Sequence, residues 1–326
     1  MKILVTGITG FIGQNFANAI KNDTNDYICL VRSTSKTDFL KNHSNVRVIV
    51  TDFSEKELAE LLQDVKIVVH MIGQMGGHGV QKEQFEASNC KLTLDMLNAC
   101  IHAGVKQFLY LSTPGVQGFG NRLCVETIPY APRNLYEETK VQAEKIIISS
   151  LKESDVKYTI IRPDFVYGPG DYRRIKMYKN IRDKKFVLTT SGTSYLHPTY
   201  VDDVVQGIIC AMGNINAYNE IFNISALNDV TVKEYLKTMA DYFNVSLIHI
   251  NIGYRLSCLM AGMIDWLFNL LLKKEGFVSK NKIDFLAIDH STSNEKARKM
   301  IGYKPQYDFK TGFNLTMKWI EENNLL

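Results

Sequence analysis

The stretch Val5-Thr6-Gly7-Ile8-Thr9-Gly10-Phe11-Ile12-Gly13 decides the fold of this chain. It follows an apolar run, residues 3–5, that predicts a buried strand, and it precedes residues 14–22, which have a helical pattern. Glycines at this spacing permit a tight turn, let backbone approach a pyrophosphate, and let the helix pack on the strand. The N-terminus of that helix offers free N–H groups to phosphate oxygens. The stretch therefore predicts a dinucleotide-binding strand–turn–helix unit.

The bulk composition is that of an ordinary globular protein. Of the 326 residues, 45% are hydrophobic and 22% are charged, which fits one large or two modest domains. The formal net charge is only +4, and no basic tract is interleaved with aromatic residues, so we expect no nucleic-acid partner. The six cysteines lack the spacing of metal ligands. We therefore expect no metal and a cytoplasmic protein with reduced cysteines.

Strands and helices alternate along the chain, which predicts βαβ units and a parallel sheet. We expect an α/β fold: a Rossmann-type doubly wound parallel sheet with a smaller, mixed C-terminal substrate-binding region. The dinucleotide-binding domain is expected at residues 1–165, and residues 166–326 mainly form the substrate-binding region. Segments near 198–225 are expected to return to the main sheet. The predicted strands after the first are 27–31, 46–50, 66–72, 108–112, 158–162 and 220–224, and the longer predicted helices are 85–103 and 136–151.

One apolar segment, residues 256–272, approaches the length of a membrane span. Asp265 and Asn269 interrupt it, and Gly262 weakens it as a helix. We expect a buried or pocket-lining helix, with contact to a membrane surface and a true span as the alternatives.

Tyr136 and Lys140 stand four residues apart at the start of a predicted helix, so their side chains share one face. A tyrosine pKa lies ordinarily near 10, and a neighbouring ammonium together with a cationic nicotinamide ring would lower it. Tyr136 could then exchange a proton with a substrate while the nicotinamide exchanges a hydride. Taken alone, a tyrosine and a lysine at this spacing often occur by chance on a helix. The catalytic interpretation is supported here by the glycine-rich stretch and by the hydroxyls of Ser112 and Thr113 at the end of a predicted strand.

Several further motifs accompany these residues. They are Thr6-Gly7-x-x-Gly10-x-x-Gly13, Asp52, Leu111-Ser112-Thr113, Tyr136-x-x-x-Lys140, Arg162-Pro163-x-x-Val166-Tyr167-Gly168-Pro169, Tyr200-Val201-Asp202-Asp203-Val204, and Lys296-Ala297-Arg298 with Gly302-Tyr303-x-Pro305. With them the chain resembles the extended short-chain dehydrogenase/reductase family, of the NAD-dependent epimerase/dehydratase type. The resemblance implies that Thr113, Tyr136 and Lys140 are catalytic and that Lys140 also holds the nicotinamide ribose.

The end of the second predicted strand bears on the choice of cofactor. Members that select NAD usually carry an acidic residue there, whereas this chain has Arg32, with Lys36 close behind. A basic residue can pair with a 2′-phosphate, so we favour NADP(H), with NAD(H) as the alternative. The expected cofactor-binding residues, most of them implied by the resemblance, are Gly7, Thr9, Gly10, Phe11, Ile12, Gly13, Arg32, Lys36, Asp52, Phe53, Met71, Ile72, Gly73, Asn89, Tyr136, Lys140, Pro163 and Val166.

The resemblance also limits which reactions of the family we expect. Dehydratases of this type generally carry Asp-Glu after the catalytic threonine, where this chain has Pro114 and Gly115. Many nucleotide-sugar epimerases carry an asparagine in place of Phe165 and a tyrosine in place of Gln117. We therefore expect an enzyme, a dehydrogenase or reductase acting on a small-molecule carbonyl or secondary hydroxyl, like the 3β-hydroxysteroid-dehydrogenase-like members. A nucleotide-sugar epimerase or reductase is the main alternative, and a non-catalytic dinucleotide-binding regulator a minor one.

The last expectations concern the substrate and the assembly. The residues expected to contact the substrate are Thr113, Pro114, Phe165 and His197. By family analogy we expect a homodimer that pairs through the helices predicted at 85–103 and 136–151.

Overall fold

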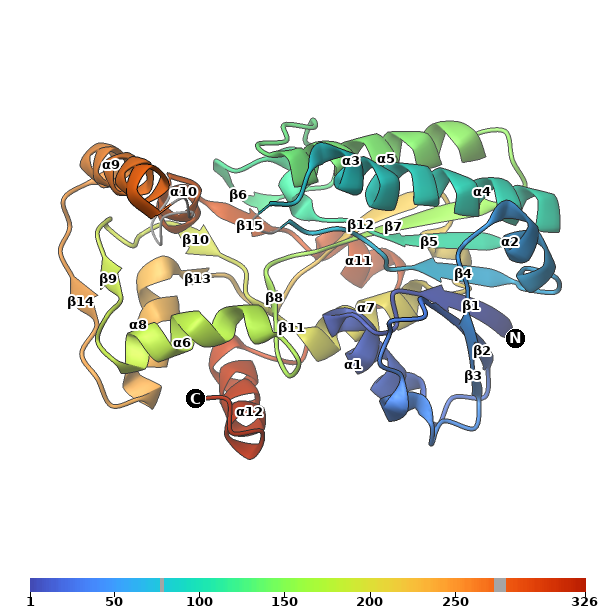
Figure 1. Ribbon diagram of the computed structural model, residues 1–326, viewed down its shortest axis with the longest axis horizontal. Helices are drawn as coiled ribbons and strands as arrows, with labels where there is room; N and C mark the ends of the chain where they lie inside the picture. Colours follow the sequence, from blue (N-terminus) through green and yellow to red (C-terminus); the bar gives the residue numbers. More distant parts are fainter. Residues whose placement is uncertain (77–78, 273–279) are drawn as a thin grey trace.

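The computed structural model describes residues 1–76, 79–272 and 280–326. Its centre is a parallel seven-stranded sheet with the strand order β12-β7-β5-β4-β1-β2-β3 (Figure 1). These strands are β1 (Lys2–Thr6), β2 (Asp26–Val31), β3 (Val46–Val50), β4 (Ile67–His70), β5 (Gln107–Leu111), β7 (Lys157–Pro163) and β12 (Glu220–Ile224). The order of connections reverses between β1 and β4, where open α/β sheets bind ligands beyond the strand ends. The expected doubly wound α/β fold is confirmed.

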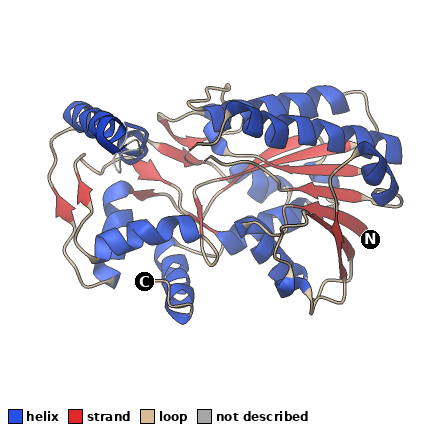
Figure 2. Ribbon diagram, viewed as in Figure 1, coloured by secondary structure: helices blue, strands red, loops and turns tan. Residues whose placement is uncertain are grey.

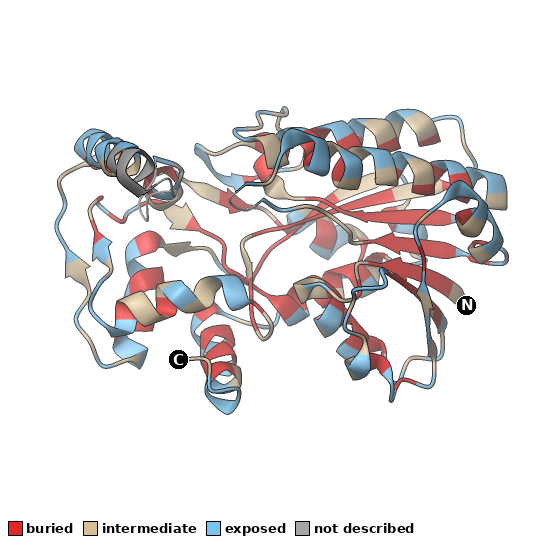
Figure 3. Cartoon of the chain, in the orientation of Figure 1, coloured by how far each residue is buried: buried red, intermediate tan, exposed pale blue. Residues whose placement is uncertain are grey.

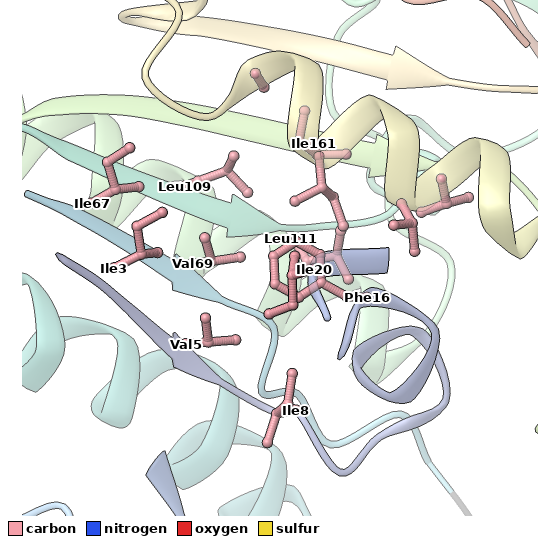
Figure 4. Close-up of a cluster of buried hydrophobic side chains, with 14 of the residues drawn as sticks. Ile3, Val5, Ile8, Phe16, Ile20, Ile67, Val69, Leu109, Leu111 and Ile161 are labelled. Carbon is pink, nitrogen blue, oxygen red and sulfur yellow. The ribbon is translucent and has the colours of Figure 1, made fainter. Parts of the chain in front are cut away.

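Helices cover both faces of this sheet (Figure 2). One face carries α2 (Glu55–Leu61), α4 (Leu92–Ala103) and α5 (Leu135–Leu151), and the other carries α1 (Phe11–Ile20), α7 (Val201–Ala211) and α11 (Glu295–Met300). Successive strand residues point to opposite faces. Ile3 and Val5 therefore pack beside Phe16 of α1 (Figure 4), whereas Leu4 joins the cluster under α4 and α5. The central strands are buried on both sides (Figure 3).

The helix predicted at 85–103 begins earlier and is irregular. It starts as α3 (Lys82–Phe85), widens into a π-helical turn over Glu86–Lys91, and continues as α4. A π turn inserts one extra residue per turn and is frequent at functional sites. Here the widened turn carries the buried Asn89, whose side chain bonds the segment that follows β4.

A smaller part lies beside the carboxyl ends of the main strands (Figure 1). Its four-stranded sheet has the order β13-β10-β15-β6. The chain passes between the two parts more than once. β6, which lies between β5 and β7 in the sequence, pairs with β15 in the smaller sheet. β12, which follows β10 in the sequence, pairs with β7 in the main sheet. The remaining bounds are β6 (Asn121–Cys124), β8 (Val166–Tyr167), β9 (Val187–Leu188), β10 (Tyr195–Leu196), β11 (Thr199–Tyr200), β13 (Val230–Thr231), β14 (Ile248–His249), β15 (His290–Thr292), α6 (Ile175–Arg182), α8 (Val232–Tyr242), α9 (Tyr254–Leu272), α10 (Lys280–Ala287) and α12 (Phe309–Glu322).

Helix α9 contains the apolar segment singled out from the sequence, and over residues 256–266 it is not the buried helix that we expected. The side chains of residues 267–272 lie outside the described part of the chain. Ser257 and Ala261 are buried, but a stripe of large apolar side chains on the same helix is exposed. The stripe consists of Leu256, Leu259, Met260, Met263 and Trp266, and Trp266 is 63% exposed. The expectation of a buried or pocket-lining helix is wrong for this face. Across the described ranges, no helix has both the length and the apolar character needed to cross a bilayer.

Candidate active site

A cavity of about 520 Å³ lies at the carboxyl edge of the main sheet. It brings together the glycine-rich turn, the segment after β4, the end of β5, the start of α5 and the segment after β7. The expected site residues that line it are Gly7, Gly10, Phe11, Ile12, Gly13, Met71, Gly73, Thr113, Tyr136, Lys140, Pro163, Phe165 and Val166.

The turn between β1 and α1 is packed so tightly that only glycine fits at two positions. A Cβ on Gly7, whose φ is +77°, would lie 2.7 Å from the carbonyl carbon of Met71. A Cβ on Gly13 would lie 2.2 Å from the carbonyl oxygen of Gly7. Gly10 is the N-cap of α1, and no acidic residue occupies the first turn of that helix. The helix N-terminus can therefore receive a phosphate, and the turn fits a dinucleotide.

The three expected catalytic residues all line this cavity. Helix α5 begins after Asn134, whose Oδ1 accepts a hydrogen bond from the Glu137 backbone N–H at 3.0 Å. Tyr136 and Lys140 follow one turn apart. Thr113 caps a short 3₁₀ helix (Pro114–Gln117), and its Oγ1 accepts from a backbone N–H at 3.3 Å. Because Thr113 Oγ1 accepts in this bond, its own hydroxyl proton can still be donated to another oxygen.

The Lys140 ammonium is held by the end of β5. Its Nζ donates to the hydroxyl of Tyr110 at 2.9 Å and to the carbonyl oxygen of Leu111 at 2.7 Å. It also lies 4.4 Å from the centre of the Tyr110 ring. Burial lowers the pKa of Lys140 to about 7.

The charge environment of Tyr136 differs from the one that we expected. Burial raises the pKa of its phenol, the Arg173 guanidinium lowers the pKa in opposition, and the Glu137 carboxylate raises it further. Lys140, which we expected to lower this pKa, makes its hydrogen bonds to β5 instead. In the protein alone Tyr136 is therefore a neutral phenol, which can donate a proton.

Asn89 does not line the cavity, but its side chain binds two segments that carry lining residues. Its Oδ1 accepts from the backbone N–H of Gln74 at 2.8 Å, and its Nδ2 donates to the carbonyl oxygen of Gln74 at 3.1 Å. The same Nδ2 donates to Thr139 Oγ1 at 2.9 Å. Asn89 thus joins the segment after β4 to α5. Gly73 lies in that segment, and a Cβ there would be 3.2 Å from Lys140 Nζ.

The other expected cofactor residues are not among those that line the cavity. Arg32 and Lys36 are exposed after β2, which is the neighbour of β1 in the sheet. Asp52 is exposed after β3 and accepts a hydrogen bond from the Ser54 backbone N–H. Phe53 packs against the core cluster beneath α4. The last two are Thr9, whose carbonyl oxygen accepts from Gln14, and the partly buried Ile72.

A second cavity, of about 170 Å³, adjoins the first through the shared residues Thr113 and Phe165. Pro114 lines it, so three of the four expected substrate residues meet here. His197 does not. Its ring is buried, with Nδ1 2.9 Å from the carbonyl oxygen of Thr292 and Nε2 3.1 Å from that of Ala226. Both ring nitrogens lie within hydrogen-bonding distance of backbone carbonyl oxygens, and His197 is not among the lining residues of either cavity, so its position does not support the expected substrate contact.

Two arginines at the first cavity were missed from the sequence. Asp171 has a buried carboxylate that accepts from Arg173 Nε at 2.8 Å and from Arg174 Nε at 2.9 Å. The Arg173 guanidinium lies 5.8 Å from the Phe11 ring, so it stands across from the glycine-rich turn. The run Asp171-Tyr172-Arg173-Arg174 was the available clue. No periodicity distinguishes these arginines from solvated ones.

Comparison with known proteins identifies the family. The model of the NAD dependent epimerase/dehydratase family matches residues 3–225. The chain belongs to the NAD dependent epimerase/dehydratase family. This confirms the resemblance drawn from the motifs, and the chain is accordingly an enzyme of the NAD-dependent dehydrogenase or epimerase kind.

Relatives of this epimerase/dehydratase-family chain include both kinds of enzyme. A 3-beta-hydroxysteroid dehydrogenase of Mycolicibacterium neoaurum is 26% identical over 323 residues, which cover 94% of this chain and 87% of that protein. A sterol-4-alpha-carboxylate 3-dehydrogenase of Candida albicans is 24% identical over 293 residues, covering 83% and 81%. The solved UDP-glucuronic acid 4-epimerase of Bacillus cereus, in complex with UDP-glucuronic acid and NAD, has a TM-score of 0.78 at 22% identity and covers 99% of this chain and 100% of its own.

Proposed function

We propose that this chain transfers a hydride between NADP(H) and a carbonyl or secondary hydroxyl of a small molecule, with Tyr136 as the acid/base. One observation carries the proposal: Thr113, Tyr136 and Lys140 line the same cavity as the glycine-rich turn. A bound nicotinamide would supply or accept the hydride.

The residues of the chain supply positioning and the proton. In the reducing direction Thr113 donates a hydrogen bond to the carbonyl oxygen and polarises it. Tyr136, a neutral phenol in its buried position, gives its proton to that oxygen as the carbon is reduced. The Arg173 guanidinium, which opposes the rise in the pKa of Tyr136, stabilises the negative charge that Tyr136 then carries, while Lys140 is held in the same cavity by Tyr110 and the Leu111 carbonyl oxygen.

We propose NADP(H) rather than NAD(H) because of the charge after β2. Arg32 and Lys36 are both exposed there, beside the strand that leads into the glycine-rich turn. A guanidinium can form charge-assisted hydrogen bonds to a 2′-phosphate. NAD(H) stays the alternative, since the solved Bacillus cereus relative holds NAD.

A plain dehydrogenase or reductase is the preferred reaction. Phe165 presents an apolar ring to both cavities, and two relatives are named as steroid or sterol dehydrogenases. A nucleotide-sugar epimerase or reductase is the second candidate. Arg173 and Arg174 line the first cavity and could meet phosphate oxygens, and the Bacillus cereus relative holds UDP-glucuronic acid.

A substrate panel separates the two candidates. Purified protein would be incubated with NADPH and, separately, with apolar ketones, hydroxylated ketones and UDP-sugars. We expect stoichiometric oxidation of NADPH with at least one ketone. Interconversion of UDP-sugar epimers without net cofactor consumption would establish the second candidate and refute the first.

Two further proposals concern assembly and location. We propose a homodimer formed through α4 and α5; the exposed Leu94 and Ile101 on α4 support it, and light scattering would test it. A cytoplasmic location rests on the six cysteines, all of which are free thiols in the structure.

A further inference from the structure

A series of buried polar side chains leads from Lys140 into the core of the main sheet. Its members come from α5, β5, α4, β4 and β1, and they are Lys140, Tyr110, Thr93, His70 and Thr6. None of them is more than 3% exposed. Thr6 immediately precedes Gly7, so the series connects the lysine of the site with the start of the glycine-rich turn. Burying polar groups is unfavourable unless they are hydrogen-bonded, so the bonds within this series define what it can do.

Three of these residues form one row across neighbouring strands. Thr6 lies opposite His70 in the pairing of β1 with β4, and His70 lies opposite Tyr110 in the pairing of β4 with β5. Thr6 Oγ1 is 2.8 Å from His70 Nδ1. The rings of His70 and Tyr110 are stacked, with their centres 5.9 Å apart. The row therefore holds together three strand ends at the edge of the sheet where the first cavity lies.

Thr93 of α4 fixes the direction of the hydrogen bonds. Its hydroxyl donates to the carbonyl oxygen of Asn89 at 2.8 Å. A hydroxyl has a single proton, so Thr93 Oγ1 can only accept from its other neighbours. His70 Nε2, at 3.3 Å from this oxygen, therefore carries the ring proton and donates it. His70 Nδ1 in turn accepts from the hydroxyl of Thr6.

His70 does not add a second positive charge beside Lys140. Burial, and then the charge of Lys140, lower the pKa of His70 to about 3. The ring is therefore neutral at every pH at which the protein would be assayed. Its two nitrogens differ, and the tautomer with the proton on Nε2 is the one that satisfies both Thr6 and Thr93.

Tyr110 joins this row to Lys140. Its hydroxyl oxygen accepts from Lys140 Nζ at 2.9 Å, and the carbonyl oxygen of Leu111 accepts from the same Nζ at 2.7 Å. Burial raises the pKa of Tyr110 well above its ordinary value, so Tyr110 keeps its proton, and Thr93 is the hydrogen-bond neighbour on its other side. The third hydrogen of the Lys140 ammonium has no acceptor among the residues that the structure describes. Because Lys140 lines the first cavity, this hydrogen is available to a bound molecule.

The other titratable side chains around Lys140 do not take the place of Tyr110. They are Glu144 and Tyr136 on α5, Cys90 on the π-helical turn and His70 on β4. The carboxylate of Glu144 already accepts from Arg162 and from the Ser112 hydroxyl. Burial raises the pKa of the Cys90 thiol, which keeps it neutral. Within the described ranges, Tyr110 and the Leu111 carbonyl oxygen are thus the direct acceptors for Nζ.

We propose that Tyr110 is a positioning residue of the reaction, which holds Lys140 as an ammonium with one N–H directed to the bound molecule, and that Thr93 and His70 hold Tyr110 in this role. The inference rests on the proposed function for the reaction that Lys140 serves. Through Thr6, the same row links the position of Lys140 to the strand that leads into the glycine-rich turn.

The first test determines the tautomer of His70 in the wild-type protein, and it needs neither a variant nor a substrate. ¹⁵N NMR of histidine-labelled protein distinguishes a ring nitrogen that carries a proton from one that does not. The His70 signals would be assigned through nuclear Overhauser contacts with the rings of Phe108 and Tyr110, whose centres lie 5.7 and 5.9 Å away. We expect the proton on Nε2 alone from about pH 5 to 9. A proton on Nδ1, or a ring that titrates in this range, overturns the inference.

The second test measures the titration of Lys140 in Tyr110→Phe. The ¹³Cε signal of Lys140, identified by its absence from Lys140→Met, would be followed against pH in the protein without cofactor. A hydrogen bond to a charged group is lost in Tyr110→Phe, so the affinity of Lys140 for its proton should fall about 10- to 100-fold, or about one to two pH units. Tyr27→Phe is the matched control, because it removes the hydroxyl of an equally buried strand tyrosine that bonds Asp23 instead. It should leave the titration of Lys140 unchanged.

Turnover separates this inference from the proposed function. If the ammonium of Lys140 is needed, kcat/KM falls as pH rises through the pKa of Lys140, and this alkaline limb should move to lower pH in Tyr110→Phe. A variant that is merely less stable would not move the limb. An unchanged Lys140 titration in Tyr110→Phe overturns the inference, and should this variant fail to fold, the His70 tautomer decides. The expected tautomer and titration without any turnover would instead count against the proposed function.

Discussion

The ion pair between Arg162 of β7 and Glu144 of α5 offers a sharp test of how the site is supported. Arg162 Nη2 lies 2.6 Å from Glu144 Oε2, and Nε lies 2.9 Å from Oε1. The hydroxyls of Ser112 and Tyr130 donate to the same carboxylate. Ser112 immediately precedes Thr113, so this buried network holds in place the end of β5, next to which Thr113 lines the cavity.

We expect Arg162→Met to be strongly destabilising. The side chains of Arg162 and Glu144 are only 2% and 0% exposed, so water cannot screen the carboxylate that the variant leaves behind. Removing one partner of a buried pair typically lowers the free energy of unfolding by about 3–5 kcal/mol. At about 2–4 °C per kcal/mol for a large domain, Tm should fall by about 6–20 °C.

Thermal and urea unfolding would measure this effect. The control is Lys237→Met, since Lys237 pairs with Asp241 on the surface and such pairs contribute about 0–1 kcal/mol. The double variant Arg162→Met/Glu144→Leu removes both charges and should be more stable than Arg162→Met alone. A loss below about 1 kcal/mol for Arg162→Met, or a double variant that is no more stable, would refute the reasoning.

Three further predictions address the cofactor turn, the cofactor choice and the buried lysine. Gly13→Ala places a Cβ 2.2 Å from a backbone oxygen, so calorimetry should show NADPH affinity at least about tenfold weaker, and unchanged affinity would contradict the turn geometry. Arg32→Asp should weaken NADP binding about 10- to 100-fold and leave NAD binding unchanged or stronger; retained NADP preference would exclude a 2′-phosphate contact. The folded-state pKa of Lys140 is lowered to about 7, so below pH 7 both folded and unfolded chains carry its proton, and above it only the unfolded chain does. The stability of the wild type relative to Lys140→Met should therefore rise between about pH 7 and 10 in urea unfolding, and a flat difference would contradict the lowered pKa.

The main sheet could be predicted because its signals are local. Five-residue segments rich in β-branched, aromatic and other apolar residues predicted the strands at 46–50 and 220–224 with the bounds that β3 and β12 have. The glycine-rich stretch placed the turn between β1 and α1. The π turn was not predictable, because it depends on the tertiary bonds of Asn89 rather than on periodicity.

The candidate active-site cavity was partly predictable for a geometric reason. The carboxyl ends of parallel strands meet at one edge, so residues after β1, β4, β5 and β7 converge there. The protonation state of Tyr136 was not predictable. It depends mainly on how deeply the phenol is buried, and that depth is known only from the fold. The burial of the His197 ring between the backbone carbonyl oxygens of Thr292 and Ala226 was not predictable either.

The second cavity lay beyond sequence reasoning. His290, one of its lining residues, belongs to β15, a strand of three residues that pairs with β6 across about 170 positions of sequence. Short strands with distant partners leave no periodic pattern. The exposed stripe on α9 was missed for a related reason: apolar content was plain, but which face would be covered depends on neighbours far along the chain.

The central claim is that Tyr136 donates the proton at a site that holds the cofactor independently. The most direct measurement is the turnover of Tyr136→Phe with a ketone substrate, made beside a calorimetric titration of the same variant with NADPH. We predict that turnover falls about 100- to 10,000-fold, since that is the usual contribution of a general acid, while the NADPH dissociation constant changes less than about threefold. Turnover near the wild-type value with intact NADPH binding would contradict the account.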